Sequence, residues 1–329
     1  MSQPSHRPGR LGVGVISAGR VGAVLGAALR GAGHAVVGVH ASSEASRERA
    51  ATLLPDVPVL DVQSIVERSE LVLLAVPDDQ LPGLVSGLAA TGAWQPGQLV
   101  VLTAGRHGTG VLEPVRAAGG IGLAVHPAMT FTGLSLDLQR LADCSFGVTA
   151  AAPVLPIAQA LVVEMGAEPV VVAEADRPLY HAALAHGSNH VMTVLGESMQ
   201  LLGEIGVEHP DRVLGPLVRA TVDNALASGE NALTGPVARG DVTTVAAHVA
   251  ALRELAGGGA RAGHDAAGPV GSADHDAAGP TGNADHDAAR QLLAGYRALA
   301  RQTARRAAAS GRLDETSYRA VMAAIEEEQ

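Results

Sequence analysis

Short apolar runs alternate with longer amphipathic segments through the first half of the chain. The runs are continuous and rich in Val and Leu, which is typical of strands buried on both faces of a parallel sheet. Ser43 and Asp61 precede amphipathic segments and are the predicted N-caps of helices over residues 44–54 and 62–68. The expected strands are residues 11–16, 35–39, 57–60, 71–76, 99–103, 121–125 and 145–148. The pattern therefore predicts βαβ units.

From about residue 153 the pattern changes to that of helices. Asp176, followed by Pro178 in the first turn, predicts a long helix that ends near Ile205. Further helices are expected over residues 211–228, 242–256, 288–310 and 317–328, with Asp241 as an N-cap. The sequence thus predicts an α/β chain in which a Rossmann-type, mostly parallel sheet domain over residues 10–150 is followed by an all-α domain over residues 151–329. Residues 1–9 are polar and are expected to form a disordered tail.

Residues 257–287 carry an eleven-residue near-repeat in which a His-Asp pair recurs. The pairs are His264-Asp265, His275-Asp276 and His286-Asp287. One interpretation is a metal site, even a hydrolytic one, because His-rich tracts sometimes bind metals. Metal ligands must converge from fixed directions, however, and a tract of Gly, Ala and Pro does not hold them there. We therefore expect a disordered low-complexity insertion and no metal site.

Composition narrows the classes of function. The 329 residues suffice for two domains, and with only 2% aromatic residues the cores must be built from Ala, Val and Leu. All 23 basic residues are Arg, which excludes a lysine acid, base or Schiff base. A formal charge of −10 is unsuited to nucleic acid.

The single cysteine, Cys144, excludes an intrachain disulfide and fits a reducing compartment. The apolar runs are shorter than a membrane-spanning helix requires. We therefore expect a cytoplasmic protein that binds neither nucleic acid nor membranes.

A glycine-punctuated turn follows the first expected strand and leads into a helix over residues 21–30. A dinucleotide fingerprint has three glycines here, and Gly19 and Gly22 stand at the second and third positions, with Ser17 at the first. Gly19 lets backbone N–H groups approach a pyrophosphate, and Gly22 allows close packing of helix on strand. The expected cofactor-binding loop consists of Ser17, Ala18, Gly19, Arg20, Val21 and Gly22.

The end of the next strand favours NADP(H) over NAD(H). An NAD enzyme places Asp or Glu there to bind the ribose, whereas this chain has His40, followed by Ser42, Ser43 and Arg47. Hydroxyls and a guanidinium suit a 2′-phosphate, although the serines also serve as plain helix caps. The strand ends that carry Val76, Pro77, Asp78 and Thr103 are expected to flank the ribose and nicotinamide.

Several stretches resemble a family of Rossmann-like NADP oxidoreductases. In this family the second domain is helical, of unknown function and related to the C-terminal domain of 6-phosphogluconate dehydrogenase. The matching stretches are residues 17–22, 75–78, 126–131, 180–183, Asn189 and 233–241. The resemblance implies the fold, a dinucleotide cofactor and a homodimer formed through the helical domain, but no substrate. More distant relatives such as ketopantoate reductase depend on a lysine that this chain lacks.

Reduction of a carbonyl or imine requires a proton donor beside the developing charge. His126 ends a strand at the edge where ligands bind, and His181 lies one turn into the long helix. Asn189 follows eight positions later, on the same broad face of that helix. Tyr180 is a phenolic donor that is expected to point elsewhere on the helix. The alternative is a structural hydrogen-bonded cluster.

Thr130, Thr234 and Arg239 are the candidate substrate-binding residues. Arg239 suits a carboxylate or phosphate, and its alternative role is a salt bridge. The leading hypothesis is an NADP(H)-dependent oxidoreductase that transfers hydride to a small carbonyl or imine substrate, especially one that bears a carboxylate. The other is a non-catalytic NADP(H)-binding sensor whose helices form an interaction surface.

Overall fold

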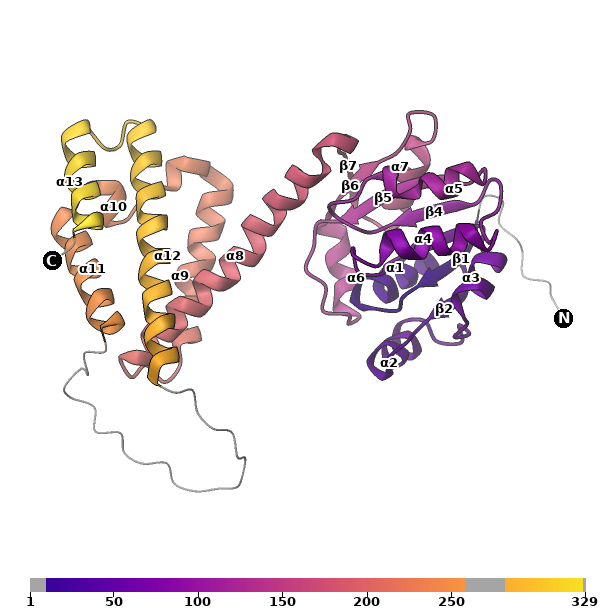
Figure 1. Ribbon diagram of the computed structural model, residues 1–329, viewed down its shortest axis with the longest axis horizontal. Helices are drawn as coiled ribbons and strands as arrows, with labels where there is room; N and C mark the ends of the chain where they lie inside the picture. Colours follow the sequence, from indigo (N-terminus) through magenta and orange to yellow (C-terminus); the bar gives the residue numbers. More distant parts are fainter. Residues whose placement is uncertain (1–9, 258–281, 328–329) are drawn as a thin grey trace, which may run out of the picture. The chain divides into compact units, whose positions relative to one another are not determined.

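The computed structural model describes residues 10–257 and 282–327. It divides into two compact units, Met1–His190 and Val191–Gln329 (Figure 1). The expected tail, residues 1–9, lies outside the described residues. Most of the expected insertion, including the pairs at 264–265 and 275–276, lies outside them as well.

The described part of the first unit contains a seven-stranded sheet with the strand order β2-β1-β3-β4-β5-β6-β7. Neighbouring strands are parallel except β5 and β6, which are antiparallel. The strands are β1 (Gly12–Ile16), β2 (Ala35–His40), β3 (Leu71–Leu74), β4 (Leu99–Leu102), β5 (Ile121–Pro127), β6 (Ser145–Thr149) and β7 (Glu168–Val171). The expected Rossmann-like, mostly parallel sheet is therefore confirmed. Because the strand order reverses between β1 and β3, a ligand site is expected at the carboxyl ends of these strands.

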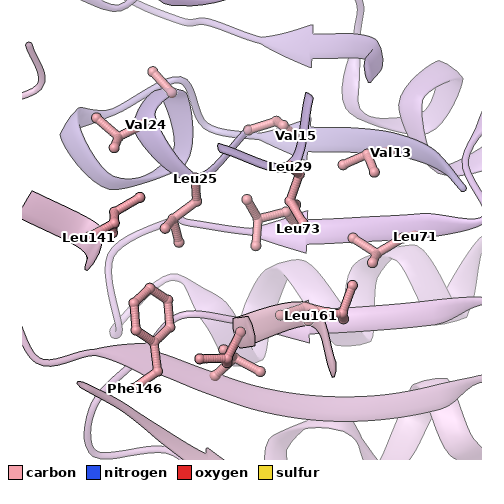
Figure 2. Packing of buried hydrophobic residues seen from close by; sticks show 14 of the residues in the cluster. Val13, Val15, Val24, Leu25, Leu29, Leu71, Leu73, Leu141, Phe146 and Leu161 are labelled. Carbon is pink, nitrogen blue, oxygen red and sulfur yellow. The ribbon is translucent and has the colours of Figure 1, made fainter. Parts of the chain in front are cut away.

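The sheet is buried on both faces. In β3, Leu71 and Leu73 belong to one core cluster, whereas Val72 and Leu74 belong to the other. Figure 2 shows the first cluster, where Leu25 of α1 and Leu161 of α7 pack with strand residues. Burial on both sides explains why the strand sequences are continuous apolar runs. The helices of this unit are α1 (Arg20–Gly31), α2 (Glu44–Leu53), α3 (Val62–Arg68), α4 (Leu81–Ala90), α5 (Glu113–Ala117), α6 (Leu136–Arg140), α7 (Leu155–Glu164) and the first part of α8 (Arg177–Glu204), with 3₁₀ turns η1 (Thr109–Leu112), η2 (Leu141–Asp143) and η3 (Glu174–Asp176).

Two predicted helix caps are confirmed. The Ser43 hydroxyl accepts a hydrogen bond from the Ser46 N–H at 3.2 Å, which caps α2. The Asp61 carboxylate accepts one from the Ser64 N–H at 2.9 Å, which caps α3. Each bond satisfies a backbone donor that a free helix end leaves without a partner.

The predicted strand at residues 57–60 is wrong. Val59 makes only an isolated parallel bridge to Val39. Pro58 lies in the middle of the run and has no N–H to donate to a ladder. The apolar run therefore adds one bridge at the sheet edge and no strand.

The sheet also continues past residue 150, where we expected the first domain to end. β7 pairs in parallel with β6, and Ala158, Leu161 and Val162 of α7 are buried in the sheet core. The boundary between the two compact units falls at His190, within α8. β7 escaped the sequence pattern because it is a four-residue edge strand that begins with Glu168-Pro169.

The second unit is helical in its described part. The core is built largely from small residues, including Val245, Ala300, Ala304, Val321 and Ile325. Asp241 caps α11 through the Thr244 N–H at 3.1 Å, as predicted. The elements are the rest of α8, α9 (Pro210–Ser228), η4 (Gly229–Ala232), α10 (Pro236–Arg239), α11 (Val242–Ala256), α12 (Gly282–Ala309) and α13 (Glu315–Glu326).

α12 begins earlier than the sequence pattern indicated. Residues 282–287 are helical, although we expected them to belong to the disordered insertion. Ala is the strongest helix former, and Asp is favourable in a first turn, so this end of the repeat extends the helix that follows. Within residues 10–257 and 282–327, each helix is too short or too polar to cross a lipid bilayer.

Candidate functional site

The turn after β1 has the geometry of a phosphate-binding loop. Ser17 has a φ of 81°, in the left-handed region that the customary glycine adopts without strain. A Cβ on Gly22 would lie 2.1 Å from the Ser17 carbonyl oxygen, so only glycine lets α1 approach β1 this closely. A Cβ on Gly19 would meet the Ser17 hydroxyl oxygen at 3.5 Å, which leaves open space over the loop. Serine thus occupies the first position of the fingerprint, and its side chain leaves the space over the loop free for a ligand.

The amino end of α1 is available to an anion. Within the described chain, no side chain caps this helix at Gly19. Its first N–H groups, from Arg20, Val21 and Gly22, are the donors that a helix start offers to a phosphate. A pyrophosphate would satisfy donors that the fold leaves unbonded, so the residues present fit a dinucleotide.

Two arginines lie beside this loop. The Arg49 guanidinium donates a hydrogen bond to the Ala18 carbonyl oxygen at 3.2 Å. A Cβ on Gly133 would lie 2.8 Å from the Arg49 Cδ and 3.1 Å from the Arg20 Cγ, so the loop after β5 packs against both side chains. Sequence reasoning missed Arg49, which comes two positions after the predicted Arg47 and is less exposed than Arg47.

The predicted 2′-phosphate residues follow β2 directly. Ser42 is exposed, and Ser43 is the N-cap of α2 with its hydroxyl bonded to Ser46. Arg47 forms an exposed ion pair with Glu44 at 3.4 Å, and such pairs are weak. The side chain can therefore leave Glu44 at little cost.

Val76, Pro77 and Asp78 follow β3, and Thr103 follows β4, at the same edge of the sheet as the loop after β1. Asp78 forms an ion pair with Arg106 at 3.4 Å. Thr103 is buried, and its hydroxyl donates to the Leu74 carbonyl oxygen at 3.3 Å. Thr103 therefore joins β3 to β4, whereas the Asp78 and Arg106 side chains are accessible at this edge.

A cavity of about 230 Å³ lies between the carboxyl end of β5 and the first part of α8. Four predicted site residues line it together: His126, Thr130, His181 and Asn189. The remaining lining residues are Pro127, Ala128, Met129, Leu184, Ala185 and Ser188. Residues 181, 184, 185, 188 and 189 recur at helical spacing, which brings one face of α8 to the strand end.

The rings of His126 and His181 converge beside Gly105. Their centroids are 5.9 Å apart with the planes nearly perpendicular. A Cβ on Gly105 would lie 3.0 Å from the Nε2 atom of each histidine and only 2.4 Å from the Cδ2 atom of His181. The absent side chain at Gly105 is what lets the two Nε2 atoms face the same point.

Tyr180 contacts the Nδ1 side of the His126 ring, and Arg177 in turn packs against Tyr180. The Tyr180 hydroxyl lies 3.0 Å from the His126 Nδ1 atom. Arg177 is fully buried and donates to Thr149 Oγ1 at 2.8 Å and to the carbonyl oxygens of Ala124 and Gly147 at 2.9 and 3.0 Å. It therefore ties β5 to β6. Its guanidinium carbon is 5.8 Å from the centre of the Tyr180 ring.

Burial and nearby positive charge set the protonation of this cluster. Burial, then His181 and Arg177, lowers the pKa of His126 to about 4. Burial raises the pKa of the Tyr180 phenol, and Arg177 opposes this only in part. His126 is thus neutral, and Tyr180 keeps its proton, at physiological pH.

Thr234 and Arg239, the other predicted substrate residues, lie in the second unit. The Arg239 guanidinium donates to the Thr234 hydroxyl at 3.4 Å. Thr234 lines a separate cavity of about 480 Å³ with residues of α9 and η4. The structure therefore brings these two residues together with each other and places them apart in the chain from the His126 cavity.

The sequence hardly indicated Arg177, Tyr180, Gly105 and Arg49, because their importance depends on contacts between distant segments. Tyr180 stands next to His181, yet its hydroxyl reaches the other histidine. The described ranges contain no group of three or more His, Cys, Asp or Glu side chains placed to hold a metal ion. The metal interpretation of the His-Asp pairs at 264–265 and 275–276 lies outside the described residues.

Two family models match the chain. A Rossmann-like domain matches residues 1–127, and a domain of unknown function, DUF2520, matches residues 144–261. No curated protein matches the chain.

Several solved structures share the fold. A putative NADP oxidoreductase from Bacteroides fragilis is 20% identical with a TM-score of 0.63, over 74% of this chain and 92% of its own. An imine reductase from a Pseudomonas species is 18% identical with a TM-score of 0.53, over 74% and 84%. The 1-pyrroline-5-carboxylate reductase of Streptococcus pyogenes is 16% identical with a TM-score of 0.50, over 67% and 81%. The two family models thus give the chain a Rossmann-like domain followed by a DUF2520 domain, the order that its motifs indicated.

Proposed function

We propose that this protein is an NADP(H)-dependent oxidoreductase that reduces a small carbonyl or imine substrate. The observation that carries the proposal is the cavity in which His126 and His181 converge, at the sheet edge that also bears the phosphate-binding loop. The ends of β1, β4 and β5 share this edge, where a dinucleotide would be held. Hydride donor and proton donor then meet at one place.

The loop after β1 and the amino end of α1 hold the pyrophosphate. Arg20 and Arg49 supply positive charge beside it, and Ser42, Ser43 and Arg47 hold the 2′-phosphate of NADP. A bound dihydronicotinamide supplies the hydride. Thr130 and Asn189 orient the substrate, while the histidines donate hydrogen bonds and a proton to the atom that gains negative charge.

The similar structures agree with this reaction class. They include an imine reductase and a 1-pyrroline-5-carboxylate reductase, whose names denote reduction of C=N bonds. Thr234 and Arg239 are proposed to bind an acidic group of the substrate. Replacing Arg239 by Ala then raises KM for carboxylate-bearing substrates and not for neutral ones.

The helical domain is proposed to form a homodimer, and residues 151–329 to act as this dimerising and substrate-binding half. Among the described residues, α9 contributes no buried side chain. Val213, Leu217, Val222 and Leu226 of this helix are exposed, and exposed apolar side chains that gather on one helix commonly meet a partner. Together with the single cysteine, this supports a cytoplasmic enzyme of two identical chains.

Titration with NADPH and NADH, followed by turnover assays on keto acids and cyclic imines, tests the proposal. We expect tight binding of NADPH, weaker binding of NADH and substrate-dependent oxidation of NADPH. His181→Asn should retain NADPH binding and lose about 10²–10⁴-fold in kcat. NADPH binding without turnover on any substrate would favour the non-catalytic sensor. Failure to bind either cofactor would refute both.

A further inference from the structure

The two histidines of the cavity have different neighbours. His126 is held at its Nδ1 atom by the Tyr180 hydroxyl, at 3.0 Å, and its ring meets the Tyr180 ring edge-on. His181 approaches the same point from the helix face and lines the cavity. The Nε2 atom of His126 faces Gly105 and His181, away from Tyr180.

The surroundings of Tyr180 decide which partner donates the hydrogen bond. Tyr180 packs against Gly147, where a Cβ would lie 2.6 Å from the hydroxyl oxygen. The Arg177 guanidinium lies over the Tyr180 ring, and its hydrogen bonds go to Thr149 and to carbonyl oxygens rather than to the Tyr180 hydroxyl. Among the described residues, the His126 Nδ1 atom is the acceptor within hydrogen-bond distance of this hydroxyl, so the phenol directs its proton there.

We propose that Tyr180, backed by Arg177, fixes His126 as the tautomer with hydrogen on Nε2, and that this neutral ring donates a hydrogen bond into the cavity while His181 supplies the transferable proton. The inference rests on the proposed reductase function. Tyr180 and Arg177 are positioning residues, since they act on the substrate only through His126.

The proton balance of the reaction follows from this division. As hydride from the dihydronicotinamide reaches the substrate carbon, the π-electron pair of the C=O or C=N bond moves onto the heteroatom. The Nε2–H of His126 donates a hydrogen bond to that atom and keeps its proton. One proton passes from the His181 ring to that atom. The products are the alcohol or amine and the oxidised nicotinamide.

The charges around His126 agree with this arrangement. The titratable groups that face it are Tyr180, Arg177 and His181, all from α8, and Cys144 acts on Tyr180. Its other neighbours are Gly105 from the loop after β4 and Gly147, which pairs with it across β5 and β6. Burial, His181 and Arg177 all lower the pKa of His126, so a second positive charge is disfavoured on this ring.

Nitrogen-15 NMR of the histidine rings in the full-length protein tests the tautomer without any substrate. Long-range ¹H–¹⁵N correlation spectra distinguish a protonated ring nitrogen from a bare one, and His126→Gln assigns the signals. We expect the His126 Nε2 atom to be protonated and Nδ1 to be bare across neutral pH, with titration near pH 4. Tyr180→Phe keeps the ring over Gly147 but removes the hydroxyl, so the His126 signals should shift to those of mixed tautomers.

The chain offers a matched control. His248 and Tyr296, in the helical unit, form a pair with the same atoms in contact, Nδ1 to hydroxyl oxygen at 2.9 Å, and with edge-on rings. Tyr296→Phe should change the His248 signals and leave those of His126 unchanged. Tyr180→Phe should do the reverse.

A His126 ring with hydrogen on Nδ1, or one whose signals ignore Tyr180→Phe, would overturn the inference. Turnover separates this outcome from failure of the proposed function. If Tyr180→Phe binds NADPH as wild type does and its kcat falls about tenfold or more, the tautomer matters to the reaction. If NADPH binds and kcat is unchanged, Tyr180 has no positioning role. If NADPH does not bind the wild-type protein, the reductase proposal fails whatever the tautomer.

Discussion

At the scale of single residues, the backbone of Ser17 is the clearest departure from a dinucleotide fingerprint. Its φ of 81° is costly for a residue with a Cβ, and a glycine there would be unstrained. Glycine also gives the unfolded chain more freedom, which offsets part of the gain. We expect Ser17→Gly to raise the free energy of unfolding by about 0.5–1 kcal/mol, measured by urea denaturation.

Ser42→Gly is the control for this prediction. Ser42 is a loop serine as well, but Ser17 and Asp56 are the positive-φ non-glycine residues in the described chain. Ser42→Gly should therefore leave stability unchanged or reduce it slightly. If Ser17→Gly is destabilising, the hydroxyl makes a contact that outweighs the backbone strain.

The lowered pKa of His126 makes the stability of the first unit depend on pH. The folded protein holds this pKa near 4, whereas the unfolded chain has the ordinary value of 6.5. Between these values the unfolded chain binds more protons than the folded protein. The free energy of unfolding therefore decreases as the pH falls from 6.5 toward 4. The loss amounts to at most about 3 kcal/mol.

Urea unfolding across this pH window, compared with His126→Gln, measures the effect. The variant cannot titrate at position 126, so its stability should fall less steeply on acidification, and other groups cancel in the comparison. Parallel pH profiles of the two proteins would show that the His126 ring stays solvated.

The sequence predicted several of the residues that line the cavity, but not the buried residues that hold them in place. His126, Thr130, His181 and Asn189 were found because a strand end and a helix face each place polar groups by a simple rule. Arg177 could not be found this way. Its importance comes from carbonyl oxygens of β5 and β6, which lie 53 and 30 residues away in the sequence. Long-range partners of a buried side chain leave no periodic trace in one sequence.

At the scale of elements, the turn between β1 and α1 separates two roles of glycine. Gly22 makes room for the helix against the strand, while Gly19 faces open space. Gly22→Ala should cost about 3 kcal/mol, because the Cβ meets backbone that cannot move away. Gly19→Ala should leave stability within about 0.5 kcal/mol of wild type and weaken NADPH binding at least tenfold. Thermal unfolding and fluorescence titration with NADPH measure the two effects.

A Gly19→Ala protein that binds NADPH as tightly as wild type would mean that the pyrophosphate does not approach this loop. A Gly22→Ala protein of normal stability would mean that α1 can move away from β1. Because the two substitutions add the same methyl group, any difference between them reflects position alone.

Element by element, the apolar runs predicted six of the seven strands in the described chain. They missed one strand that is not a long apolar run. They also predicted one strand, from an apolar run, that does not form. The segment Glu168–Val171 joins the edge of the sheet with mostly exposed residues, so it lacks a buried pattern. Residues 57–60 have the pattern, but Pro58 removes a ladder donor. Pairing partners, rather than local sequence, decide both cases.

At the scale of the whole molecule, the apolar surface of α8 and α9 is left to be explained. Met192 is 68% exposed and Leu226 is 83% exposed. On α9, Val213 and Leu217 lie on the opposite side from Val222 and Leu226, given 100° per residue. A helix that is apolar on both sides is normally buried, so the proposed homodimer predicts that the partner chain covers α9.

We expect the wild-type protein to sediment as a dimer, and Met192→Asp and Leu226→Asp each to shift it toward monomer by at least tenfold in dissociation constant, since a buried unpaired carboxylate costs more than about 1.4 kcal/mol. Sedimentation equilibrium over a range of protein concentrations measures this constant. Leu134→Asp is the matched control, because Leu134 is 62% exposed but lies in the loop after β5. Dissociation caused equally by all three substitutions would indicate general destabilisation. A wild-type monomer would leave the apolar faces of α8 and α9 open to a different partner and would contradict the homodimer.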